Sequence, residues 1–116
     1  MSPLVDPAQL QRLRSDLGGD ATVQHRFVHD FLALRQPREL RLSAALAVAD
    51  LEDAEVVLLS IRSSSQMLGA VRLHHTAGRL QRTLKSQDLP SCRAQLAHLS
   101  VVGVDTCRAL SRHIAY

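Results

Sequence analysis

The chain has 116 residues, a net charge of +3 and a hydrophobic content of 46%, which suit one domain with one buried core. Aromatic residues make up only 3% and tryptophan is absent, so aliphatic side chains must fill that core. No segment reaches the roughly 18 consecutive apolar residues of a membrane span, and charged residues interrupt the region where a signal peptide would lie. We therefore expect one domain over residues 1–116 that resides in the cytoplasm and does not associate with membranes.

A short first helix and a longer second one are predicted on either side of a glycine pair. Asp6 and Pro7 are typical of a helix start, and Gln9 completes a capping-box pattern. Gly18 and Gly19 then end the first helix, because glycine tolerates the positive φ values found there. The next residue, Asp20, is expected to cap the second helix.

The second helix carries apolar residues at spacings of four, four and three, which is one helical face: Val23, Phe27, Phe31 and Leu34. Pro37 interrupts this pattern. Apolar positions then resume at Leu40, Ala44 and Val48, with Leu42, Ala45 and Leu46 widening the stripe. Either one long helix kinked at Pro37 or two abutting helices fits this arrangement.

Three further helices follow the cap predicted at Asp50. The third is expected to turn a stripe of five residues inward and to end at Gly69: Ala54, Leu58, Ile61, Ser65 and Leu68. The fourth buries Leu73, Ala77, Leu80 and Leu84. After a polar break at residues 86–88, the last buries Cys92, Leu96, Leu99, Val102 and Leu110, with Gly103 permitting close packing.

No stretch alternates as a strand would, and the connections between the predicted helices are short. The sequence therefore predicts an all-α fold, an antiparallel four-helix bundle with an additional short N-terminal helix. Cys92 and Cys107 lie in the same predicted helix, about 22 Å apart at 1.5 Å per residue, so we expect both to be reduced.

Charge is divided unevenly between the two halves of the chain. Residues 1–55 carry six basic and nine acidic groups, whereas residues 56–116 carry eight basic and two acidic groups. Arg72, Arg79, Arg82 and Lys85 follow one another in the fourth helix. Such a row could contact an acidic protein surface or remain a solvated face. Nucleic acid is not expected, because recognition motifs and stacking aromatics are lacking.

Residues 59–70 carry a recognisable motif, Leu59-Ser60-Ile61-Arg62-Ser63-Ser64-Ser65-Gln66-Met67-Leu68-Gly69-Ala70. This stretch resembles the motif of the histidine-containing phosphotransfer domain family, His-x-Leu-Lys-Gly-Ser-Ser followed by Leu-Gly-Ala. The resemblance covers nearly the whole chain. It includes the Leu17-Gly18-Gly19-Asp20 turn, the Pro37-Arg38-Glu39-Leu40 segment and the spacing of nine residues between Asp50 and position 59.

The resemblance implies a bundle whose outward histidine carries a phosphoryl group between receiver-domain aspartates. The family's basic residue three positions later helps to neutralise the phosphate, and the glycine after it keeps the surface low. In this chain Leu59 stands in place of the histidine, Ser63 in place of the glycine, and Arg62 keeps the basic charge. Leucine has no nucleophilic atom, so phosphotransfer at position 59 is chemically excluded.

A stripe of Glu55, Leu59, Arg62 and Gln66 lies opposite the inward stripe of the third helix. A single exposed leucine is commonplace, but with Val56 one turn earlier it could form a small apolar docking spot. The sequence thus predicts a non-phosphorylatable module of two-component signalling, without enzymatic activity or cofactor. It would bind a response-regulator or hybrid-kinase receiver domain through Glu55, Val56, Leu59, Ser60, Arg62, Ser63 and Gln66.

Alternatives remain open at this point. His75, in the helix after the motif, could accept phosphate instead, or the bundle could be an adaptor for a transcription-regulatory partner. His25 and His29 are spaced as two metal ligands on one helix, but no third ligand lies nearby, so no metal is expected. Ser63, Ser64 and Ser65 lack a neighbouring base. The chain is expected to be a monomer or a weak homodimer.

Overall fold

The computed structural model describes residues 3–114 and contains five α-helices, with no strand in that range. The helices are α1 (Pro7–Asp16), α2 (Ala21–Ala47), α3 (Leu51–Met67), α4 (Val71–Lys85) and α5 (Leu89–His113). The predicted all-α fold class is therefore confirmed. None of the described helices is long and apolar enough to cross a membrane.

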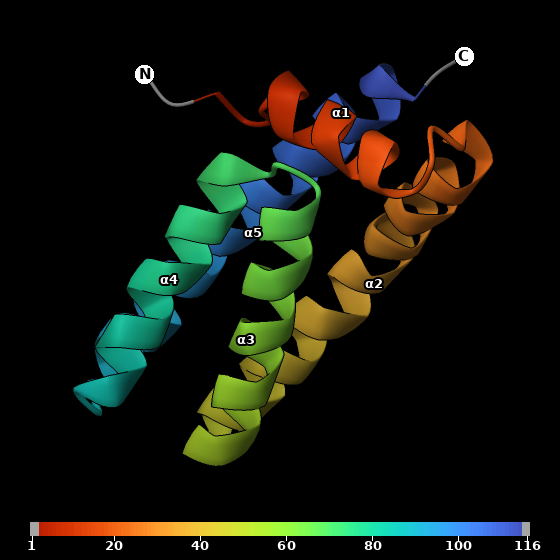
Figure 1. The fold of residues 1–116 in the computed structure, drawn as a ribbon. Helices are drawn as coiled ribbons and strands as arrows, with labels where there is room; N and C mark the ends of the chain where they lie inside the picture. The colour runs from red at the N-terminus through yellow and green to blue at the C-terminus, as the bar shows by residue number, and fades with distance from the viewer. Residues whose placement is uncertain (1–2, 115–116) are drawn as a thin grey trace.

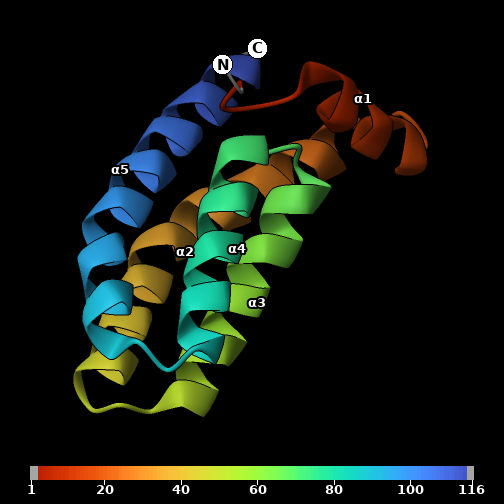
Figure 2. The ribbon, with the colours of Figure 1, turned by 90° about the vertical axis from the view of Figure 1, so that its left-hand side faces the viewer.

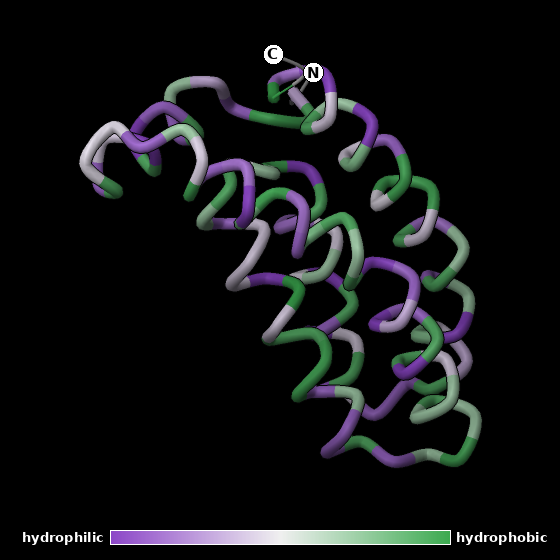
Figure 3. Tube along the Cα trace, turned by 90° about the vertical axis from the view of Figure 1, so that its right-hand side faces the viewer, coloured by the Kyte–Doolittle hydropathy of each residue, from purple (hydrophilic) through white to green (hydrophobic). Residues whose placement is uncertain are grey.

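The four longer helices pack together as a bundle, and α1 lies across one end of it (Figure 1). α3 lies between α2 and α4, while α5 contacts both α2 and α4 on the other side. Each long helix thus has two neighbours among the other long helices, and α2 and α3 also contact α1. Hydrophobic and hydrophilic segments alternate along the helices (Figure 3), so each helix turns one face into a shared core.

Aspartate side chains begin four of the helices by accepting hydrogen bonds from backbone N–H groups of the first turn: Asp6, Asp20, Asp50 and Asp88. An N-terminal carboxylate stabilises a helix because the first N–H groups have no partner within it. The starts predicted at Asp6, Asp20 and Asp50 are confirmed. Gly18 and Gly19 have φ values of 72° and 78°, which confirms the glycine-ended first helix.

The turn between α3 and α4 fastens α1 to the bundle. The Asp6 N–H donates to the Gly69 carbonyl oxygen at 2.8 Å, and Gln9 Nε2 donates to the Gln66 carbonyl oxygen at 3.5 Å. Gly69 has a φ of 70°, and a Cβ there would lie 2.8 Å from both the Asp6 oxygen and the Gln9 Cβ. Only glycine fits this contact. The capping box predicted at Gln9 is wrong. The Asp6 N–H and the Gln9 side chain, which the box would pair with each other, donate instead to the Gly69 and Gln66 carbonyl oxygens.

Leucine side chains dominate the core, and six of them are almost fully buried: Leu42, Leu46, Leu58, Leu80, Leu99 and Leu110. Every residue of the inward stripes predicted for α3 and α4 is buried, so the rotation of both helices is confirmed. In α5 the predicted stripe is also buried, except that Leu96 is only partly covered.

The apolar face predicted for α2 is confirmed at Phe31, Leu42, Ala45 and Leu46 and wrong at several other positions. Phe27, Leu34, Leu40 and Val48 are exposed, and the buried positions are Gln24, Val28, Phe31, Leu42, Ala45 and Leu46. α2 continues through Pro37 as one helix of 27 residues. Its rotation is set partly by a buried polar contact, because Gln24 Nε2 donates to the Leu10 carbonyl oxygen at 2.8 Å. A polar residue in the core cannot be predicted from apolar spacing.

α5 packs closely on α2 at Gly103, as predicted. A Cβ at Gly103 would lie 2.9 Å from the Glu39 Oε2 atom. Glu39 is held in place by Arg35 Nη1 and by Ser100 Oγ, each of which donates to Glu39 Oε1 at 2.9 Å. Cys92 and Cys107 are both free thiols, and Cys92 lies in the core, as expected.

Candidate functional site

The outer side of α3 carries an exposed apolar stripe. Val56, Leu59 and Met67 are 45%, 46% and 45% exposed, and Ser60 and Ser63 lie between them at helical spacing. These residues face outward because the opposite side of α3, through Leu58 and Ile61, is packed in the core. We call the set Val56, Leu59, Ser60, Ser63 and Met67 the α3 outer face.

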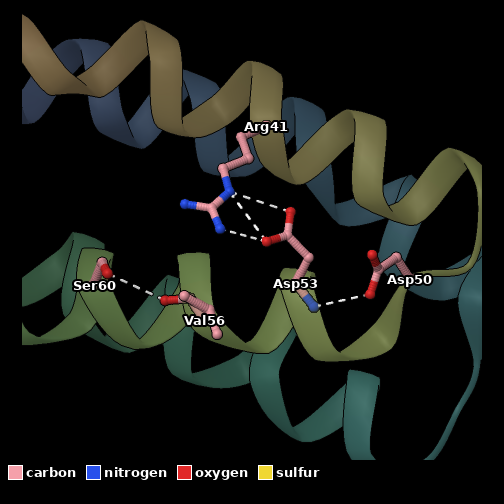
Figure 4. A network of polar contacts seen from close by, with 5 residues as sticks. All are labelled: Arg41, Asp50, Asp53, Val56 and Ser60. Carbon is pink, nitrogen blue, oxygen red and sulfur yellow. Dashed lines mark hydrogen bonds and ion pairs between the residues drawn. The ribbon is translucent and has the colours of Figure 1, made fainter.

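Leu59 lies at the centre of the α3 outer face, and its exposure agrees with the sequence-based expectation. Its side chain offers neither a nucleophile nor a hydrogen-bonding atom. The hydroxyl of the next residue is engaged within α3, because Ser60 Oγ donates to the Val56 carbonyl oxygen at 3.1 Å (Figure 4). The α3 outer face can therefore bury apolar area against a partner.

Arg62 and Glu55 are only partly exposed, although the sequence placed them on the outward stripe with Leu59. Both side chains turn towards α4 and meet Gln81, which is buried. Arg62 Nη1 donates to Gln81 Oε1, and Gln81 Nε2 donates to Glu55 Oε1 at 2.5 Å. The guanidinium lies over Gly78, where a Cβ would be in ordinary van der Waals contact with Arg62 Nε at 3.6 Å. The charge of Arg62 is thus directed to the α3–α4 contact and away from Leu59.

An ion pair borders the other edge of the α3 outer face. Arg41 of α2 contacts the Asp53 carboxylate through its Nε and Nη2 atoms, and the Asp53 N–H donates to Asp50 Oδ1 at 3.0 Å (Figure 4). The hydrogen bond from Arg41 holds the pKa of Asp53 below its ordinary value of 3.8 and raises the pKa of Arg41. This pair joins the start of α3 to α2.

Apolar residues of α2 extend the exposed apolar surface beyond α3. Phe27 and Leu34 lie with Met67 around a groove of about 120 Å³ between the two helices. Arg38 crosses this groove, where its Nη1 donates to Ser64 Oγ at 3.3 Å and burial lowers its pKa from the ordinary value. The sequence reasoning missed this surface. Met67 was detectable because it continues the spacing of Leu59 and Ser63, whereas Phe27 and Leu34 had been assigned to the core.

The remaining predicted residues are spread over the bundle. Gln66 and Ser63 are exposed on α3, while Ser65 is fully buried and its Oγ has no partner among the described residues. His75 is exposed on α4, with its ring 5.7 Å from that of His74, centre to centre. No group of three or more His, Cys, Asp and Glu residues suited to a metal ion occurs within residues 3–114.

No family model matches the chain, and neither the curated proteins nor the solved structures contain a match to it. Functional inference therefore depends on the residues and their arrangement alone.

Proposed function

We propose that this chain is a pseudo-phosphotransfer domain, a non-phosphorylatable member of the histidine-containing phosphotransfer type. In this proposal the bundle has that type's antiparallel four-helix arrangement with a short N-terminal helix. It acts in the cytoplasm as an interaction module of bacterial two-component signalling. It docks the receiver domain of a response regulator or hybrid kinase without carrying phosphate.

The observation that carries the proposal is the exposure of Leu59 at the centre of an apolar stripe. The motif places a phosphorylatable histidine at this position, and an exposed side chain is what receiver access requires. The burial of the neighbouring residues agrees with an outward side chain at position 59, since Leu58 and Ile61 face the core and Leu59 does not. Replacing histidine by leucine removes the nucleophile and adds apolar area at the same place.

The proposed contact surface consists of the residues predicted from the motif: Glu55, Val56, Leu59, Ser60, Arg62, Ser63 and Gln66. Within this set Val56 and Leu59 would supply the apolar area, and the two serines would keep the surface low between them. Met67, Phe27 and Leu34 extend the same surface towards α2. Glu55 and Arg62 would contribute mainly by holding α3 against α4, because their side chains already bond to Gln81.

The test mixes the purified protein with receiver domains carrying a labelled aspartyl phosphate, and measures binding and label transfer separately. We expect binding without retained label. The variant Leu59→Arg should lose binding, whereas Val101→Arg should keep it. The latter is a matched control, because it also charges an exposed apolar residue but lies on α5.

Label retained by the wild-type protein would contradict a non-phosphorylatable module. If the label then disappeared in His75→Ala, the protein would be a phosphotransfer protein using His75. Equal binding by the two arginine variants would instead show that the receiver does not dock on the α3 outer face. Failure of every receiver tested, with capture of a transcription-regulatory protein through Leu59, would favour the adaptor alternative.

A further inference from the structure

The edge of the bundle formed by α4 and α5, seen in Figure 2, carries a surplus of positive charge. These two helices contain seven arginine and lysine residues and a single acidic residue, Asp105. The edge formed by α2 and α3 is balanced, with five basic and five acidic residues in the two helices. The uneven charge of the chain's two halves is therefore an uneven charge of two edges of the molecule.

Two exposed arginines of α4 differ in their partners from the arginines of the α2–α3 edge. Four of the five arginines in α2 and α3 bond to side chains of the protein: Arg35 to Glu39, Arg38 to Ser64, Arg41 to Asp53 and Arg62 to Gln81. Both ion pairs found within residues 3–114 belong to this edge. Arg79 and Arg82 of α4 are exposed and take part in neither ion pair. Their charge is not balanced by carboxylates on the described surface.

A groove of about 310 Å³ lies between α4 and α5 beside these cations. Thr76 and Arg79 line it from α4, and Ala94, Gln95 and His98 line it from α5. Gln95 Nε2 donates to Thr83 Oγ1 at 2.9 Å, a bond that ties the two helices together along the groove. The groove therefore has a fixed wall on each side and a small apolar patch at Ala94.

Arg79 lines the groove and also belongs to a row of cationic and imidazole groups on the exposed side of α4. His75, Arg79 and Arg82 are spaced by four and three residues, so they lie on one side of α4. The rise of an α-helix places His75 and Arg82 about 10 Å apart along the axis, roughly three residues of extended chain. His98 is exposed on the opposite wall. The site is therefore sized for a short extended segment.

The chemistry of this surface favours carboxylates of a protein as the ligand. Arginine pairs with carboxylate through two parallel hydrogen bonds, and two arginines are available side by side. A nucleic acid would need more phosphate contacts than this short row offers, and α4 and α5 contain no Phe, Tyr or Trp to stack on a base. Insertion into a membrane would need large exposed apolar side chains, and α4 has none.

We propose that the exposed side of α4, together with the α4–α5 groove that Arg79 lines, binds an acidic, extended segment of a partner protein, with Arg79 and Arg82 pairing to its carboxylates. This second interaction surface goes beyond the proposed docking at Leu59 and does not depend on it. Binding should weaken as ionic strength rises, because exposed charges are screened by salt.

The test uses a fluorescein-labelled peptide of alternating glutamate and serine, titrated with the full-length protein at low and high ionic strength. The double variant Arg79→Gln/Arg82→Gln should bind the peptide about tenfold more weakly, since it removes two charge-assisted contacts. The matched control is Arg12→Gln/Arg26→Gln, which removes the same charge from exposed positions of α1 and α2 and should bind as the wild type does. Leu59→Arg should also keep peptide binding, which separates this surface from the proposed receiver surface.

Two results would overturn the inference. Equal weakening in both double variants would mean that only net charge attracts the peptide. Tighter binding of a DNA duplex or of anionic lipid vesicles than of the peptide, at the same ionic strength, would assign the basic edge to a different class of ligand.

Discussion

At position 62 the bundle uses an arginine for packing where the resemblance implies a phosphate-neutralising role. Arg62 lies across Gly78 and donates to the buried Gln81, which in turn donates to Glu55. Arg62→Ala should lower the free energy of unfolding by about 1–3 kcal/mol, because Gln81 Oε1 would lose its donor in a buried site. Arg82→Ala, an exposed arginine on α4, should change it by less than about 0.5 kcal/mol. Chemical denaturation measures both, and similar values for the two variants would show that the Gln81 bond is not stabilising.

The ion pair between Arg41 and Asp53 predicts an acid dependence of stability. The hydrogen bond from Arg41 lowers the pKa of Asp53 in the folded protein below 3.8. A depressed carboxyl pKa stabilises the fold at pH values above the unfolded-state pKa, and this contribution is lost as the pH falls through the folded-state value. Asp53→Asn should therefore have a lower thermal midpoint than wild type at pH 7, and the difference should shrink below about pH 4. Asp30→Asn serves as the exposed control, and a difference independent of pH would contradict the assignment.

At the scale of a helix, two neighbouring leucines show which side of α3 faces the core. Leu58 is fully buried and Leu59 is half exposed, although they are adjacent and chemically identical. Leu58→Ala should destabilise the protein by about 2–5 kcal/mol through lost burial and the cavity left behind. Leu59→Ala should cost less than about 0.5 kcal/mol. Urea denaturation measures the free energy of unfolding of both variants. Comparable losses of stability would mean that Leu59 is also packed in the core.

The helices differ in how well the sequence predicts them, for physical reasons. The inward stripes of α3 and α4 are predicted correctly because one apolar stripe of each faces the core, and the ends of α3 are marked by Asp50 and Gly69. α2 is harder, because apolar residues occupy two adjacent faces and the buried contact of Gln24 helps to select between them. Helical spacing also predicts the exposure of Leu59. It cannot predict that Arg62 bends back to α4, since that depends on its hydrogen bond to Gln81 in another helix.

At the scale of the whole molecule, the bundle has a row of exposed apolar residues on one edge and an excess of positive charge on another. The α3 outer face and the groove beside Phe27 form the apolar surface of the α2–α3 edge. The α4–α5 edge has the exposed cations Arg79 and Arg82 on α4, and Arg79 lines the groove between the two helices. A small bundle with two chemically distinct surfaces can contact two partners, since each long helix has one side in the core and one outside.

This separation predicts that the two surfaces can be inactivated independently. Leu59→Arg should abolish capture of a receiver domain and leave binding of the glutamate-serine peptide within about twofold of wild type, because the substitution lies on α3. Arg79→Gln/Arg82→Gln should show the reverse pattern, with receiver capture kept and peptide affinity reduced. Both activities can be measured on the same preparations, by pull-down for the receiver and fluorescence anisotropy for the peptide. Loss of both activities in either variant, in a protein whose helical circular dichroism and thermal midpoint are unchanged, would mean that a single surface serves both ligands.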